Sequence, residues 1–132
     1  MSVGSFDPTA AAPAIDAEMM TTLLDAAALP DVDDFGLDQV TVKRLASSVR
    51  QDAQAWQSAA ETLADEQLIA LVRFFTLAEG RLAGWDLGAK SPVIPLVRLL
   101  KKRGGYPTDL TGWIKSNSDN RFLPHGSLMD RL

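Results

Sequence analysis

The sequence predicts an all-α fold, a single-domain helical bundle of about five helices with a central antiparallel helical hairpin. No stretch of about four to eight residues alternates between polar and apolar side chains as a half-buried strand would. Apolar residues instead recur at helical spacing, in segments separated by glycine and proline. The length of 132 residues fits one domain with a core of its own.

The domain is expected to span residues 13–132. Residues 1–12 should form a flexible tail, because Gly, Ser, Ala and Pro dominate them. The first helix follows Pro13 and ends before Pro30, and an acidic linker then leads to Gly36. The apolar face of this helix contains Ile15, Met19, Leu23 and Ala27.

The clearest helical pattern lies between residues 42 and 63. Its apolar positions, spaced by three or four residues, are Val42, Leu45, Val49, Ala53, Trp56, Ala60 and Leu63. This spacing predicts one long amphipathic helix, capped by Asp38, with a narrow apolar seam of the kind that coiled coils use. The seam can belong to the core or form half of an interface with another chain.

A second long helix is expected from Asp65 to Glu79, with Asp65 as its cap and Gly80 at its end. Because this segment is apolar on nearly every side, it should be central and buried. We expect it to pair with the 42–63 helix as the core hairpin.

Two shorter helices complete the predicted bundle. Ser91 and Pro92 begin the first of them, and Gly104 follows its end, where three basic residues complement the helix dipole. Thr108 is expected to cap the last helix.

The composition excludes several kinds of site. The chain has no cysteine and one histidine, so disulfides, cysteine nucleophiles and the usual zinc sites are excluded. It contains no glycine motif for phosphate or dinucleotide binding and no nucleophile elbow, so we expect neither a metal nor a cofactor. The N-terminus lacks the features of a signal peptide, and the longest apolar run, residues 68–72, is far shorter than the roughly 20 residues of a membrane helix. We therefore expect a cytoplasmic protein that does not contact a membrane.

The net charge of −4 is unevenly distributed along the chain. Residues 1–40 contain eight acidic residues and no basic one, whereas the remainder contains all 13 basic residues and nine acidic ones. Attraction between the two parts can help the domain to close, which is the simpler interpretation. Alternatively, the acidic segment covers a basic surface that binds an anionic partner.

A basic group is the first candidate site. Residues 90–103 contain five basic residues and no acidic one, Arg121 follows, and Tyr106 and Trp113 are near in sequence. Nucleic acid or a nucleotide would use such a set, with phosphates on the charges and bases on the rings. The pI of about 4.8 and the ordinary preference for basic residues at a helix end argue against this use.

His125 is the second candidate. Its side chain titrates near neutral pH and could act as a general base with Asp119 or Arg121 on a small substrate. No catalytic spacing surrounds it, however, and "LPHGS" is first of all a proline–glycine turn. Glu79 and Asp86 could also face one cleft as paired carboxylates, although 17 acidic residues offer many such pairs.

The aromatic residues Trp85, Trp113 and Phe122 lie in glycine-rich or short connecting segments. Such residues either fill the core or present an interaction surface, and the core is the favoured interpretation.

The leading hypothesis is a small helical binding protein, an adaptor, regulator or subunit partner that acts through protein–protein contacts, including self-association as a homodimer. The alternatives are nucleic-acid or nucleotide-phosphate binding and, third, an enzyme that uses His125. No residue is predicted to be catalytic in the leading hypothesis. The residues predicted to bind are Lys101, Lys102, Arg103, Trp113, Asn120, Arg121 and His125.

Overall fold

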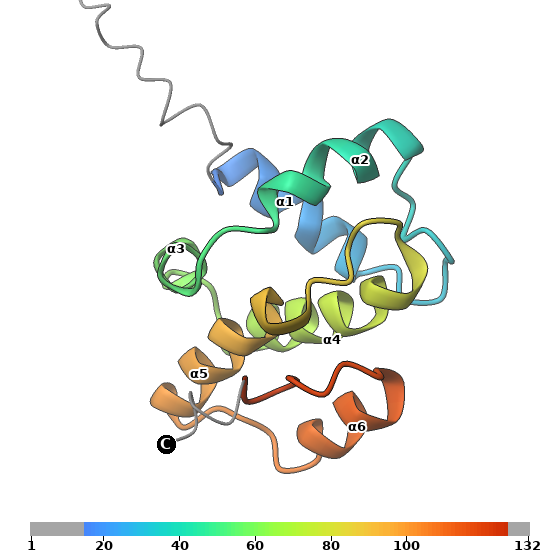
Figure 1. Ribbon diagram of the computed structural model, residues 1–132. Coiled ribbons are helices and arrows are strands. Elements are labelled where there is room, and N and C mark those ends of the chain that lie inside the picture. The colour runs from blue at the N-terminus through green and yellow to red at the C-terminus, as the bar shows by residue number, and fades with distance from the viewer. Residues whose placement is uncertain (1–14, 127–132) are drawn as a thin grey trace, which may run out of the picture.

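The structure, a computed structural model, describes residues 15–126 and is all helical within that range (Figure 1). The predicted all-α fold is thereby confirmed, while the predicted tail, residues 1–12, lies outside the described residues. The elements are α1 (Ala17–Ala27), α2 (Gln39–Ser48), α3 (Ala53–Ala60), α4 (Asp65–Arg81), the short 3-10 helix η2 (Gly88–Lys90), α5 (Val93–Arg103) and α6 (Leu110–Asn117).

The central helix is α4, as the sequence predicted. In Figure 1 it crosses the middle of the molecule, with α1 and α2 above it and α6 below it. It packs against α1, α5 and α6, and it runs through Gly80, the predicted end, to Arg81. The hairpin differs in detail from the prediction, because α4 packs to a similar extent against α5 and α1, and α3 packs against α5.

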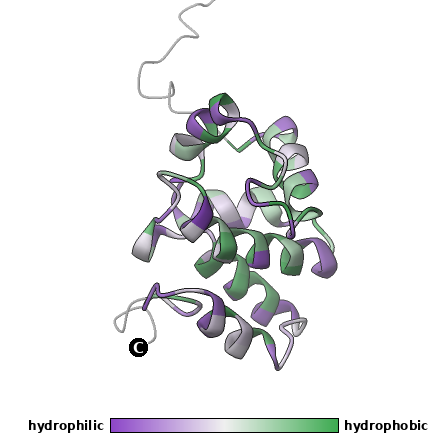
Figure 2. Cartoon of the chain, turned by 90° about the vertical axis from the view of Figure 1, so that its right-hand side faces the viewer, coloured by the Kyte–Doolittle hydropathy of each residue, from purple (hydrophilic) through white to green (hydrophobic). Residues whose placement is uncertain are grey.

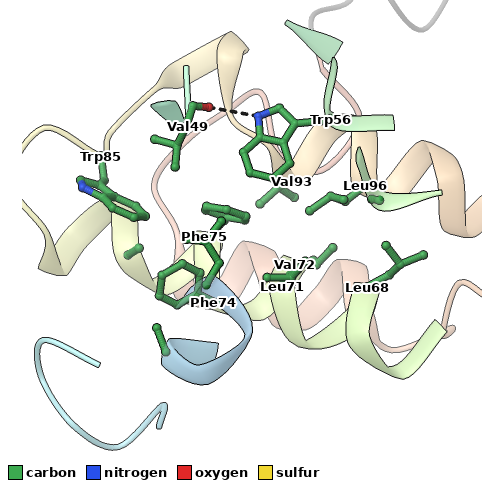
Figure 3. Packing of buried hydrophobic residues seen from close by; sticks show 14 of the residues in the cluster. Val49, Trp56, Leu68, Leu71, Val72, Phe74, Phe75, Trp85, Val93 and Leu96 are labelled. Carbon is green, nitrogen blue, oxygen red and sulfur yellow. Dashed lines mark hydrogen bonds between the residues drawn. The ribbon is translucent and has the colours of Figure 1, made fainter. Parts of the chain in front are cut away.

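The predicted helix over residues 42–63 is divided into α2 and α3. The carboxylate of Asp52 accepts a hydrogen bond from the N–H of Ala55 at 2.8 Å and so caps a new helix. The indole N–H of Trp56 donates to the carbonyl oxygen of Val49 at 3.1 Å, which satisfies a group left free where α2 ends (Figure 3). A continuous helix was therefore the wrong prediction, because the capping aspartate turns the chain.

Most of the apolar seam of this region nevertheless lies in the core. Val49, Trp56 and Ala60 are 0% exposed, and Val42 and Leu45 are buried as well. These side chains are covered by other parts of the same chain, whereas Ala53 of the predicted seam is exposed and Leu63 is half-buried.

Aromatic rings fill the centre of the core (Figure 3). The ring of Phe74 packs edge-to-face on the rings of Phe75, Phe35 and Trp85, with centroids 5.1, 4.8 and 5.8 Å away. The indole N–H of Trp85 donates to the carbonyl oxygen of Val42 at 3.1 Å, which ties the glycine-rich connection after α4 to α2. Trp85 thus belongs to the core, as favoured, and in Figure 2 hydrophobic residues are concentrated in the central helices.

Local capping sets several helix boundaries. Asp38 accepts a hydrogen bond from the N–H of Thr41 at 2.7 Å and is the predicted cap of α2; this bond holds the pKa of Asp38 below its usual value. Asp65 is not the cap of α4. The cap is Ala64, whose N–H donates to the side-chain oxygen of Gln67 at 2.9 Å.

The C-terminal end of α5 is as predicted, whereas its N-cap is Pro92, one residue after the predicted cap, Ser91. The hydroxyl oxygen of Ser91 accepts a hydrogen bond from the N–H of Val93 at 3.2 Å. Gly104 follows the last residue with a φ of +75°, a left-handed conformation that favours glycine. The residue before α6 is Asp109 rather than the predicted cap, Thr108.

Candidate functional site

A set of hydrogen bonds, here called the polar clamp, joins the C-terminal segment to α4. The carboxylate of Glu79 accepts hydrogen bonds from the hydroxyl of Ser118 at 2.9 Å and from the side-chain amide of Asn120 at 2.7 Å. The amide of Asn120 also donates to the carbonyl oxygen of Gly88 at 3.0 Å. Asn120, predicted to bind a partner, thus connects α4, η2 and the C-terminal segment.

A hollow of about 400 Å³ lies beside the polar clamp, and Glu79, Asp86 and Asp119 are among the residues that line it. Glu79 and Asp86 therefore do face one hollow, as the sequence suggested. Burial raises the pKa of Glu79, the hydrogen bonds from Asn120 and Ser118 oppose the rise, and the charge of Asp86 adds to it. Within residues 15–126 no three carboxylates are grouped closely enough to hold a metal ion. Because both oxygens of Glu79 already accept hydrogen bonds, the polar clamp serves to position the chain.

Glu79→Gln is expected to remove a pH dependence of stability. Since the pKa of Glu79 is raised on folding, the folded protein holds this proton more tightly than the unfolded chain. The resulting stabilisation is fully present below the unfolded pKa of about 4.3 and is lost as the pH rises through the higher folded pKa. The unfolding free energy of wild type minus that of Glu79→Gln should therefore fall from about pH 4 toward neutrality, as urea unfolding across this range will measure.

Glu79→Ala provides the comparison, because it removes the acceptor that glutamine retains. At neutral pH it should cost about 1–2 kcal/mol, since the donors of Ser118 and Asn120 lose their partner. A difference between wild type and Glu79→Gln that is flat or rises with pH would contradict the assigned role of burial.

Arg103, predicted to bind an anion, is held by the chain itself. Its guanidinium donates to the carbonyl oxygens of Glu61 and Leu63 at 2.5 and 2.7 Å and pairs with the carboxylate of Asp65 at 3.2 Å. Arg103 thus fixes the end of α5 to the connection between α3 and α4.

His125 lies in the predicted turn, where the N–H of Gly126 donates to the carbonyl oxygen of Phe122 at 2.6 Å. Its Nδ1 is 3.1 Å from Nζ of Lys101, whose ammonium also lies over the ring of Tyr106, 5.1 Å from its centroid. Because an ammonium can only donate, Nδ1 is the acceptor in this contact. Ser127 and Asp130 are also within sequence reach of His125, but both lie outside the described residues.

The other residues predicted to bind do not bring Arg103 and His125 together into one site. Lys102 is exposed, the guanidinium of Arg121 lies 5.1 Å from the centroid of the Phe122 ring, and Trp113 contacts α4. The basic residues of positions 90–103 are thus divided among several places: Arg103 contacts the α3–α4 connection, Lys101 the C-terminal turn, Lys102 is exposed, and Lys90 and Arg98 line a separate hollow beside the start of α3.

A larger hollow of about 510 Å³, here called the α4 groove, runs along the outer face of α4. Pro30, Asp31 and Phe35 line it on the side of the loop after α1, and Trp113 and Asn117 line it on the side of α6. Along α4 itself the lining residues include Glu66, Ile69, Ala70, Arg73, Leu77 and Arg81.

Sequence reasoning missed the α4 groove, because it treated α4 as buried on nearly every side. Ile69 and Leu77 are only half-buried, and they lie on the face that the groove leaves open. A signal was present: Glu66, Arg73 and Arg81 are spaced by seven and eight residues and so mark one polar stripe along the helix.

Aromatic rings orient the two arginines of the α4 groove. The guanidinium of Arg73 lies 5.5 Å from the centroid of the Trp113 ring, and that of Arg81 lies 5.0 Å from the centroid of Phe35. Arg81 also donates to the carbonyl oxygen of Pro30 at 2.7 Å. Among residues 15–126, no carboxylate forms an ion pair with Arg73.

Comparison of the chain with protein family models, with curated proteins and with solved structures found no match. None of the helices within residues 15–126 combines the length and the apolar character that a membrane span requires.

Proposed function

We propose that this chain is a binding protein that receives a segment of a protein partner in the α4 groove. The observation that carries the proposal is the combination, on one open helix face, of half-buried Ile69 and Leu77 with Arg73, whose guanidinium lies over the ring of Trp113. Tryptophan and arginine at the centre of a desolvated apolar patch are the residues that contribute most to protein–protein binding.

The loop beside the α4 groove supports the same function. Leu29 and Val32 are 44% and 42% exposed, and they flank Pro30 and Asp31, which line the groove. Apolar side chains exposed next to an apolar hollow enlarge the surface that a partner would cover. The volume of about 510 Å³ is also large enough to accept several side chains of a partner.

Site-specific photocrosslinking tests the proposal. A photoreactive amino acid in place of Ala70 lies in the α4 groove, and one in place of Lys102 lies on the basic end of α5. We expect a partner to be crosslinked in cells from position 70 and not from position 102. Crosslinking from position 102 alone would instead favour the anion-binding alternative, and a crosslinked pair of identical chains would identify a homodimer.

The affinity for the identified, purified partner, measured by titration, must then depend on the α4 groove. Ile69→Glu places a charge on the groove floor and should weaken binding at least about tenfold. Val40→Glu is the matched control, because Val40 is 75% exposed on α2 and does not line the groove. Equal affinities of both variants for the partner would overturn the proposal.

A further inference from the structure

We infer that the segment bound in the α4 groove is an amphipathic helix that carries an Asp or Glu midway between two apolar residues seven or eight positions apart. This inference rests on the proposed function and deepens it, because it names the chemistry of the partner. It follows from the order of side chains along the groove floor.

The spacing of the apolar residues sets the first requirement. Ile69 and Leu77 are eight residues apart on one helix, which places them about 12 Å apart along its axis. A partner helix that lies along α4 reaches both with apolar residues at positions i and i+7 or i+8, which share one face. An added strand is disfavoured, because the described part of the chain offers no strand edge to extend.

The charge between these anchors sets the second requirement. Arg73 lies four residues from both Ile69 and Leu77, so it is at the midpoint of the groove floor. Its guanidinium lies over the ring of Trp113, 5.5 Å from the centroid, and the side chain is exposed, so its N–H groups are accessible to a carboxylate. Since no carboxylate in residues 15–126 pairs with Arg73, a carboxylate of the partner would complete this contact.

The other charged residues of the α4 groove do not pair with Arg73, and none of them takes its place at the midpoint of the groove floor. Arg81 is already engaged by the carbonyl oxygen of Pro30 and the ring of Phe35. Glu66 is seven residues from Arg73, about 10 Å along the helix axis, and so marks the groove's end rather than its middle. A partner helix with a basic residue at the midpoint would face Arg73 with a like charge, which disfavours it.

A displayed library of helical peptides tests the inference. Each peptide has two fixed leucines seven or eight positions apart and random residues between them, and selection is carried out on folded wild type, Arg73→Glu and Ile69→Glu. Lys43→Glu makes the same charge change on the exposed face of α2 and serves as the control. Circular dichroism and urea unfolding establish that each variant is folded.

On wild type and Lys43→Glu we expect enrichment of Asp or Glu three to five positions after the first leucine. Synthetic peptides with Glu at this position should bind wild type at least about tenfold more tightly than those with Lys. On Arg73→Glu the preference should change to Lys or Arg.

Two outcomes would overturn the inference, and they are distinguishable. Peptides that bind wild type but not Ile69→Glu, with no preference for charge at the midpoint, would refute the acidic helix and leave the proposed function standing. A library in which no peptide distinguishes wild type from Ile69→Glu would refute both.

Discussion

Replacing Trp56 with alanine is expected to lower the free energy of unfolding by about 3–5 kcal/mol. Trp56 is 0% exposed, and its ring packs edge-to-face on Phe75 with centroids 5.2 Å apart. Alanine would leave a cavity between α3 and α4 and would also deprive the carbonyl oxygen of Val49 of its indole donor. Urea unfolding followed by far-ultraviolet circular dichroism measures the loss.

Trp113→Ala is the matched control for this prediction. It makes the same substitution at a half-buried position on the edge of the α4 groove, where the removed ring leaves an open surface. Its cost should be well below half of that of Trp56→Ala, because little cavity forms. Similar losses for the two variants would contradict the burial assigned to Trp56.

Replacing Phe35 with alanine is expected to cost about 3–4 kcal/mol. Phe35 is 1% exposed and packs edge-to-face on Phe74, and the guanidinium of Arg81 lies over its ring, so it anchors the loop between α1 and α2. Because this loop lines the α4 groove, the variant should also bind the partner more weakly. Thermal or urea unfolding gives the first effect, and titration with the partner gives the second.

The backbone at Phe35 permits a sharper comparison. Its φ of +57° is a left-handed conformation that costs an L-residue about 1–2 kcal/mol and costs glycine almost nothing. Phe35→Gly should therefore be more stable than Phe35→Ala by about 1 kcal/mol, although glycine is ordinarily the more damaging replacement. A Phe35→Ala variant more stable than Phe35→Gly would contradict the left-handed conformation assigned to this position.

The fold could be predicted as far as local patterns determine it. Start and stop signals and an apolar run located α4 and α5, and the single signals at Asp38 and Gly104 placed two helix ends correctly. The break between α2 and α3 could not be seen from spacing, because the apolar period continues through it. It depends on Asp52 acting as a cap and on the long-range packing of Trp56, and only the second of these requires the folded core.

The candidate site could be predicted less well, for a physical reason. Sequence reasoning selected residues by chemical type, and several of these, such as Arg103 and Asn120, are occupied by contacts within the chain. The α4 groove depends on where α1 and α6 leave one face of α4 uncovered, which is a property of packing rather than of spacing. Of the residues predicted to bind, Trp113 alone lines the α4 groove, and Arg73, whose guanidinium lies over its ring, was not among them.

Amide chemical shifts of the ¹⁵N-labelled protein, recorded during titration with a peptide selected on wild type, test the α4 groove most directly. The structure predicts that the largest changes occur in residues 66–81 and at the indole N–H of Trp113, with smaller changes in residues 29–35. Changes confined to residues 98–104 and 121–126 would contradict it. They would transfer the binding function to the basic end of α5 and the C-terminal turn.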